Sequence, residues 1–123
     1  MVDVIVTTGA LMAHGLVEST GRYHFKYDPK MNDTKLYEAG YNRVYDTLEP
    51  EKNLDDVYTL FDKILSDSNP KESLSSARIC KLLGEYLHKN EKGRGILKSA
   101  FEKNVPVFIP AFTDSEIGLD FAL

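Results

Sequence analysis

Two threonines and a glycine directly follow the first apolar run of the chain. The run is VDVIV, residues 2–6, and Thr7, Thr8 and Gly9 come next. In open parallel sheets, ligands gather beyond the carboxyl ends of the strands, where helix N-termini leave free backbone N–H groups. A glycine at such a turn lets the backbone approach a phosphate or a ribose closely. The pattern predicts a nucleotide-type contact here, although T-T-G lacks the full G-x-G-x-x-G fingerprint of a dinucleotide site.

A second apolar run ends in residues of the same chemical kind. It is VPVFIPAF, residues 105–112, and Thr113 and Asp114 follow it. Either residue can cap the helix that we expect next, and Asp114 can also accept hydrogen bonds from a ribose. Helix capping alone would explain these residue types, so the prediction of a ligand site depends on the two strand ends taken together.

Three histidines and two acidic residues complete the set of groups that could do chemistry. His14 lies one turn into the first expected helix, and its charge can change near neutral pH. A catalytic or substrate-contacting role is one interpretation of His14, and a surface or packing role is the other. His24 and His88 have no spacing typical of a metal site, so we interpret both as structural or solvated. Glu116 and Asp120 would share a helix face, where a solvated acidic first turn is the simpler explanation.

The first half of the chain is expected to form a strand, a helix and a long connection. The apolar spacing after Gly9 predicts a helix to about Glu18. Residues 19–34 are rich in turn formers and predict a connection with a short extended piece at residues 23–27. Gly40 is typical of a helix end, and residues 41–48 indicate a second extended segment.

The second half of the chain shows helical periodicity. Asn53 is expected to cap a helix that runs through Leu65, and Ser73 or Ser75 to begin another that runs through Leu87. A third helix is predicted over residues 95–103, ending at Asn104 before the strand at 105–112. A last helix is expected to open after that strand.

Strands that alternate with helices predict an α/β fold with a parallel sheet and flanking helices. The strand at residues 2–6 is apolar enough to be covered on both faces. Two clear strands and one doubtful strand fall below the usual sheet of about five or six strands. Residues 1–123 are therefore predicted to be an incomplete portion of a larger domain.

Composition excludes several classes of protein. The 123 residues are 42% hydrophobic and 28% charged, as expected for one globular domain. The formal charge of -4 gives no overall positive field for nucleic acid or an anionic membrane. No apolar run reaches the roughly 20 residues of a membrane span, and no signal peptide precedes the first strand, so we expect a cytoplasmic protein. Cys80 is the single cysteine, which excludes an internal disulfide and predicts a buried, inert thiol.

Four stretches carry a resemblance to a known family. They are VDVIVTTG, LYEAGYNRVYDTLEP, SSARICKLLGEYL and NVPVFIPAFTDSEIG. In that order they resemble the middle section of deoxyhypusine synthase and of bacterial deoxyhypusine-synthase-like proteins, and V-P-V-F-x-P-A-x-T-D is the most specific motif. The resemblance implies a Rossmann-like fold, bound NAD and a homotetramer with active sites between subunits. Deoxyhypusine synthase uses NAD to oxidise spermidine and passes the aminobutyl group through a lysine imine to a lysine of a translation factor.

The resemblance also assigns roles to residues. It implies that Thr8, Gly9, Ala10 and Asp114 line the NAD. Where the synthase carries two glutamates that hold the cationic nitrogens of the polyamine, this chain has Ala13 and His14. His14 is therefore predicted to contact an amine substrate, although a protonated imidazole would repel a cation, and the identity of the amine stays open.

The resemblance leaves the catalytic lysine outside residues 1–123, together with further NAD-binding segments. Because an imine-forming lysine is indispensable for aminobutyl transfer, we expect this chain to be inactive alone. It is then a segment of an NAD-dependent transferase of this family. The alternative is a short non-catalytic subunit that docks on a longer relative, since unpaired sheet edges favour association with a second chain. A third possibility is a free-standing nucleotide-binding module.

Overall fold

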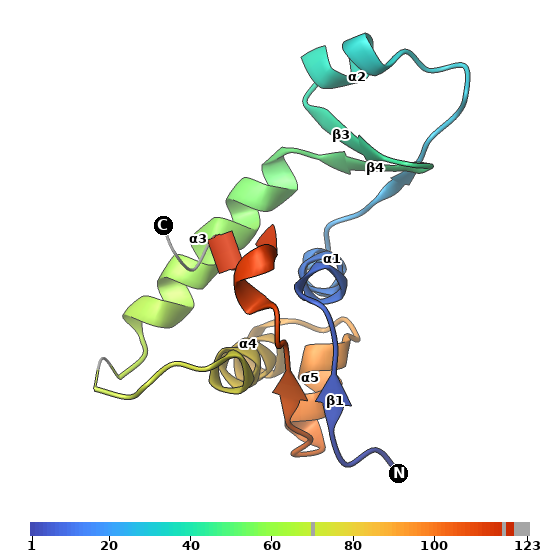
Figure 1. Cartoon of the computed structure of the whole chain (residues 1–123). Coiled ribbons are helices and arrows are strands. Elements are labelled where there is room, and N and C mark those ends of the chain that lie inside the picture. The colour runs from blue at the N-terminus through green and yellow to red at the C-terminus, as the bar shows by residue number, and fades with distance from the viewer. Residues whose placement is uncertain (70, 117, 120–123) are drawn as a thin grey trace.

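A computed structural model describes residues 1–69, 71–116 and 118–119. Figure 1 shows a body in which helices pack against one side of a short parallel strand pair, and an arm that projects from it and carries a small antiparallel sheet. The elements in chain order are β1 (Ile5–Val6), α1 (Gly9–Ser19), β2 (Phe25–Lys26), α2 (Asp33–Glu38), β3 (Tyr41–Val44), β4 (Thr47–Pro50), α3 (Lys52–Ser66), α4 (Ser76–Asn90), α5 (Ile96–Glu102), β5 (Val107–Phe108) and the 3-10 helix η1 (Phe112–Asp114).

The parallel pair joins the two apolar runs near the ends of the chain. In β1 and β5, Ile5 lies opposite Val107 and Val6 opposite Phe108. The ladder continues where the Thr7 N–H donates to the carbonyl of Phe108 at 3.0 Å. The structure therefore confirms an α/β fold with a small parallel sheet and flanking helices, with strands shorter than the predicted ranges.

One face of this pair is open among the described residues. Val107 and Ile109 are buried in the helical core, whereas Val4, Val6 and Phe108 are 50%, 64% and 42% exposed. The prediction that the first strand is covered on both faces is not met in this part of the chain. Successive side chains of a strand point to opposite faces, and the helices of the body pack against one of them.

The extended segment predicted at residues 41–48 is a hairpin and not a strand of the parallel sheet. β3 and β4 pair antiparallel through a two-residue connection, in which Tyr45 has a φ of 55°. A connection this short can join antiparallel strands only, since a parallel crossover needs a dozen or more residues. β4 also pairs with β2, so the arm holds a separate three-stranded sheet in the order β2-β4-β3.

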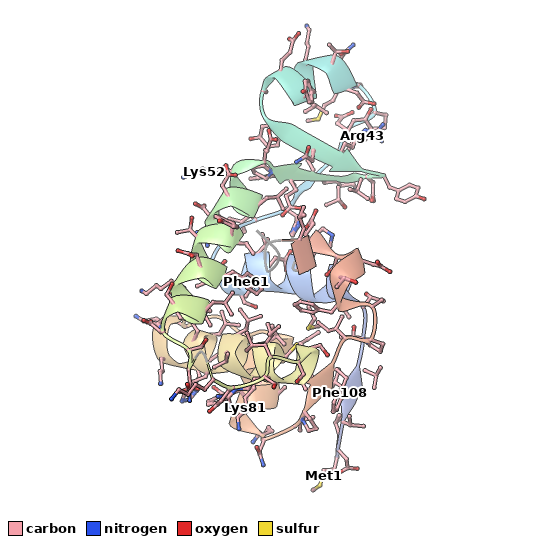
Figure 2. All side chains as sticks on the ribbon, turned by 60° about the vertical axis from the view of Figure 1, so that its left-hand side comes forward. Met1, Arg43, Lys52, Phe61, Lys81 and Phe108 are labelled. Atoms are coloured by element: carbon pink, nitrogen blue, oxygen red, sulfur yellow. The ribbon has the colours of Figure 1, made fainter. Side chains whose placement is uncertain are left out.

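The core lies between the helices and one face of the strand pair. Phe61, labelled on α3 in Figure 2, is 1% exposed, as are Leu83 and Leu87 of α4. The periodicity predicted for these helices is thus confirmed. The buried cluster comprises Met12, Ala13, Leu16, Val17, Val57, Phe61, Ile64, Ile79, Cys80, Leu83, Leu87, Leu97, Ala100, Val107 and Ile109.

Of the two helix caps predicted at Ser75 and Asn53, the structure confirms only the one at Ser75. Ser75 caps α4, because its hydroxyl accepts a hydrogen bond from the Arg78 N–H at 3.3 Å. Asn53 does not cap α3, which begins at Lys52. Asn53 is instead buried, and its side-chain amide donates to the Tyr23 carbonyl at 3.4 Å. A tertiary contact to the segment before β2 therefore explains the asparagine.

The single cysteine is buried, as predicted. Cys80 is 3% exposed in α4, and burial raises the pKa of its thiol to about 11. Because the thiolate is the reactive form, this thiol is poorly suited to nucleophilic chemistry at neutral pH. The described helices also include none that is long and apolar enough to cross a membrane.

Helices α4 and α5 approach each other at Gly84. A Cβ atom added there would lie 2.5 Å from the Leu97 carbonyl oxygen and 2.8 Å from the Phe101 Cβ. In an exposed helix the change from glycine to alanine stabilises by about 0.5–1 kcal/mol. At Gly84 we expect the opposite sign, a loss of about 1–3 kcal/mol in the free energy of unfolding, because the added atom overpacks the interface.

Gly15 is the matched control, because it lies inside α1 with no atom within 4 Å of an added Cβ. Urea unfolding of the Gly84→Ala and Gly15→Ala variants measures both changes. Equal stabilisation by the two substitutions would contradict the close packing of α4 on α5.

Candidate functional site

The two predicted strand ends meet at one edge of the parallel pair. β1 leads into α1 and β5 leads into η1, so both turns lie at the carboxyl edge. Gly9 packs directly on Ser115, since a Cβ added to Gly9 would lie 2.2 Å from both the Cβ and the Oγ of Ser115. The structure therefore brings together the two segments that sequence analysis assigned to a ligand site.

The predicted cofactor-binding residues have different surroundings at this edge. Thr8, Ala10 and Asp114 are exposed, whereas Gly9 is buried. The Thr8 hydroxyl caps α1 by accepting a hydrogen bond from the Leu11 N–H at 3.3 Å. The packing against Ser115 is sufficient to explain the glycine. The three exposed residues are free to contact a ligand.

The prediction that Thr113 or Asp114 caps the last helix is wrong. Both residues lie within η1, and it is the Ser115 hydroxyl that accepts a hydrogen bond from the Gly118 N–H at 3.2 Å. The Asp114 carboxylate is therefore not used as a helix cap. The predicted pairing of Glu116 with Asp120 cannot be placed, because Asp120 lies outside the described residues.

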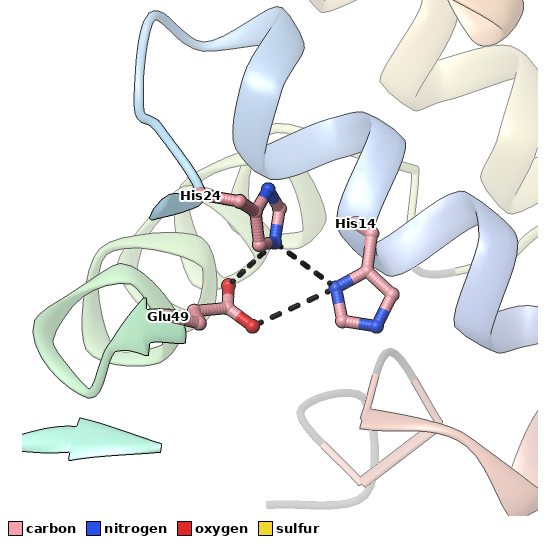
Figure 3. A group of neighbouring side chains, drawn as sticks. All are labelled: His14, His24 and Glu49. Carbon is pink, nitrogen blue, oxygen red and sulfur yellow. Dashed lines mark hydrogen bonds and ion pairs between the residues drawn. The ribbon is translucent and has the colours of Figure 1, made fainter. Parts of the chain in front are cut away.

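A second group of polar side chains lies where α1 faces the arm. Figure 3 shows His14, His24 and Glu49 pointing toward one another. The Nδ1 of His14 lies 3.2 Å from the Nε2 of His24 and 3.6 Å from the Oε2 of Glu49. The Nε2 of His24 lies 3.5 Å from the Oε1 of Glu49. Two imidazole nitrogens and a carboxylate thus converge on one point.

Regular secondary structure positions each of these side chains. His14 and Glu18 are four residues apart on α1, which places them on one helix face. In the antiparallel pairing of β2 with β4, Phe25 lies opposite Leu48. One step beyond that pair are His24 and Glu49, which the continued register places across from each other on one face of the sheet.

Glu18 extends the group behind His24. Its Oε1 lies 3.1 Å from the His24 Nδ1. An ionised carboxylate can only accept a hydrogen bond, so Nδ1 of His24 carries the proton and donates it to Glu18. In the neutral imidazole the lone pair is then on Nε2, the atom that faces His14 and Glu49.

Glu49 is the most buried of the four. The residue is 7% exposed, and its Oε1 makes no hydrogen bond with any described residue. A buried carboxylate oxygen without a hydrogen bond is costly, so the site favours a positive charge at the point where the three side chains meet. A protonated imidazole, a cationic amine or a metal ion could supply that charge.

The group borders a cavity of about 470 Å³ between α1 and the β3–β4 hairpin. Besides His14, Glu18, His24 and Glu49, its walls include Asn42, which pairs across the sheet with Glu49, and the hairpin tip at residues 44–47. The His14 side chain is 46% exposed, so the meeting point of the three side chains is open on the His14 side. A small polar ligand has room to reach it.

Of these residues, only His14 is a candidate from the sequence alone, because His24 is expected to be structural or solvated and Glu49 has no pattern that marks it. The strand register could have placed His24 beside Glu49, but only if the hairpin had been recognised first.

The third histidine lies elsewhere on the surface. His88 is exposed and lies 3.0 Å from Glu102 between α4 and α5, and this hydrogen bond lowers the pKa of Glu102.

Comparison with known proteins identifies the family. The sequence model of deoxyhypusine synthase matches residues 1–123. This chain belongs to the deoxyhypusine synthase family. It is 37% identical over 118 residues to the protein named "probable deoxyhypusine synthase 1" of Methanosarcina mazei, covering 96% of this chain and 36% of that protein.

Other members of the deoxyhypusine synthase family are similarly close. Identity is 35% to "probable deoxyhypusine synthase 2" of Archaeoglobus fulgidus, over 99% of this chain and 40% of that protein. It is also 35% to the "deoxyhypusine synthase-like protein" of Elusimicrobium minutum, over 98% of this chain and 33% of that protein. The chain therefore spans 33–40% of the length of these curated relatives.

The contact of Gly9 with Ser115 holds the two strand-end turns together, and it can be tested by compensating substitutions. Gly9→Ala is expected to lower the free energy of unfolding by about 1–3 kcal/mol, because the new methyl group collides with Ser115. Ser115→Gly removes the colliding atoms, and at a helix cap that change costs only a few tenths of a kcal/mol, on the order of 0.3. The double variant should therefore be more stable than Gly9→Ala alone in thermal or urea unfolding. Strictly additive effects would show that the two residues do not touch.

Proposed function

We propose that this chain forms part of the NAD-binding edge of a deoxyhypusine-synthase-like aminobutyl transferase with a Rossmann-like domain. The observation that carries the proposal is the parallel pairing of β1 with β5, with Gly9 packed on Ser115. Nucleotides bind at the carboxyl edge of parallel sheets, beside helix N-termini. Membership of the deoxyhypusine synthase family supports the same cofactor.

The residues at this edge suit the cofactor chemically. Thr8 and Ala10 are exposed at the start of α1, where unpaired backbone N–H groups and the helix dipole favour a pyrophosphate. The exposed Asp114 offers a carboxylate to ribose hydroxyls. Gly9 contributes through its backbone. Bound NAD would accept the hydride when the amine is oxidised.

The amine is proposed to bind on the side of α1 that carries His14. Glu18 borders the same cavity, and its carboxylate would supply negative charge in a chain that lacks the two glutamates of the synthase. The reaction is transfer of an aminobutyl group from spermidine to a lysine of a translation factor, or a related amine transfer. The lysine that forms the imine would come from outside residues 1–123.

The open face of the strand pair is suited to being covered by another part of a larger domain. Val4, Val6 and Phe108 form an exposed apolar strip, and the curated relatives are more than twice as long as this chain. We propose that further sequence or a neighbouring subunit covers this strip in an oligomeric enzyme, because unpaired strands and apolar surface favour association. Its translation-factor substrate would place the enzyme in the cytoplasm.

Calorimetric titration of the full-length protein with NAD tests the cofactor assignment. Asp114→Ala should weaken NAD binding about 10-fold or more, because hydrogen bonds to a charged group typically contribute about 1.5–3 kcal/mol. Asp62→Ala, which removes an exposed carboxylate from α3, is the control and should leave the affinity unchanged. Unchanged NAD affinity in Asp114→Ala would refute the role of this residue, and absence of saturable NAD binding by the unsubstituted protein would refute the cofactor.

A further inference from the structure

We propose that His14, His24 and Glu49 bind a divalent metal ion, with Zn²⁺ as the best match. Two imidazoles and one carboxylate form a donor set that zinc uses in catalytic sites, where a fourth position is left open. The proposal depends on the geometry of these side chains and does not rest on the NAD-dependent function.

The spacing of the donor atoms suits tetrahedral zinc. Ligand bonds of about 2.0–2.1 Å at tetrahedral angles place the ligand atoms about 3.3 Å apart. The two histidine nitrogens are 3.2 Å apart, and each lies 3.5–3.6 Å from an oxygen of Glu49. One donor atom from each residue lies within 4.8 Å of the other two. A zinc ion at the meeting point therefore needs little movement of the protein.

The hydrogen bond from His24 to Glu18 is the second argument. Histidines that bind metals usually donate their other ring N–H to a carboxylate or a carbonyl, which fixes the tautomer and makes the ligating nitrogen more basic. The His24 Nδ1 lies 3.1 Å from Glu18, which leaves Nε2 free to coordinate.

The burial of Glu49 is the third argument. Its side chain is 10% exposed, and Oε1 makes no hydrogen bond with a described residue although it lies 3.5 Å from the Nε2 of His24. A dication at the meeting point would neutralise this carboxylate and give the oxygen a partner. Buried charges in proteins are typically paired or coordinate metals.

The cavity would hold the fourth ligand of the ion. It has a volume of about 470 Å³ and is lined by the hairpin tip as well as by the proposed ligands. A water molecule or the neutral amino group of a small molecule fits this open position. A cationic amine held at the meeting point itself is the alternative to the metal ion, because it would pair with Glu49 but could not use the imidazole lone pairs.

Zinc titration of the full-length, chelator-treated protein tests the site. We expect one equivalent to bind with a dissociation constant of about 1 μM or lower. Co²⁺ bound in place of zinc should show the intense visible absorption of a tetrahedral site. Binding weaker than about 1 mM would overturn the proposal, as would spermidine binding that needs Glu49 in a protein that takes up no zinc.

Substitutions assign the ligands. Loss of a residue that only supports a metal ligand typically lowers metal affinity by up to about 100-fold. Loss of a ligand itself should cost more, so we expect a decrease above about 100-fold for each of His14→Ala, His24→Gln and Glu49→Gln. Glu18→Ala should lower the affinity by about 10–100-fold, because it removes only the support behind His24. Because His24→Gln keeps an N–H group that can reach Glu18, we expect this variant to fold like the unsubstituted protein. Circular dichroism checks the fold.

His88→Ala is the matched control, since it removes a histidine that is paired with a glutamate elsewhere on the surface. Zinc affinity should not change in this variant. If His88→Ala lowered the affinity as much as His24→Gln, or if His24→Gln folded normally and kept full affinity, the metal would not be held by this cluster.

Discussion

The hydrogen-bonded ladder between β1 and β5 ties the two ends of the described chain together. It joins Ile5 to Val107, roughly a hundred residues apart, and closing such a loop costs conformational entropy that grows only slowly with its length. The chain between the two strands must therefore fold so that β5 comes to lie beside β1. This part of the chain includes the helices α1, α3, α4 and α5, whose apolar faces share one core with the covered side of the strand pair.

The same constraint sets the position of both proposed sites. Because β1 runs directly into α1, the exposed turn at Thr8 and the cavity at His14 lie on one helix. Six residues separate them, which is about 9 Å along the helix axis. A ligand at the strand edge and a ligand in the cavity would therefore both lie beside α1. The arm completes the cavity by bringing Glu49 from β4 and the residue before β2 against α1.

Short-range patterns predicted much of this fold, and long-range register explains most of what they missed. The helices around Phe61 and Leu83 follow from apolar spacing, and the cap at Ser75 follows from residue type. Asn53 failed as a predicted cap because its side chain is used in a contact with Tyr23, far away in sequence. The hairpin at residues 41–50 has no clear sequence signal, because its two connecting residues, Tyr45 and Asp46, lack the glycine typical of two-residue hairpin turns.

The candidate sites likewise combine residues that the sequence pattern marks with residues that only the tertiary structure brings together. Thr8 and Asp114 could be singled out from their places at the ends of apolar runs, and the pairing of the strands was needed to bring their segments together. Glu49 carries no signal of its own, since a glutamate in an extended segment is usually solvated. Its significance comes from burial and from the histidines across the sheet and on α1, which are properties of tertiary structure.

We infer that the carboxyl edge of the β1–β5 pair binds NAD, and a crystal structure of the full-length protein grown with NAD would reveal where the cofactor lies. We expect electron density for the dinucleotide in contact with the turn at residues 8–10 and with Asp114. Density for NAD at another part of the protein, with this edge unchanged, would rule out this position of the cofactor.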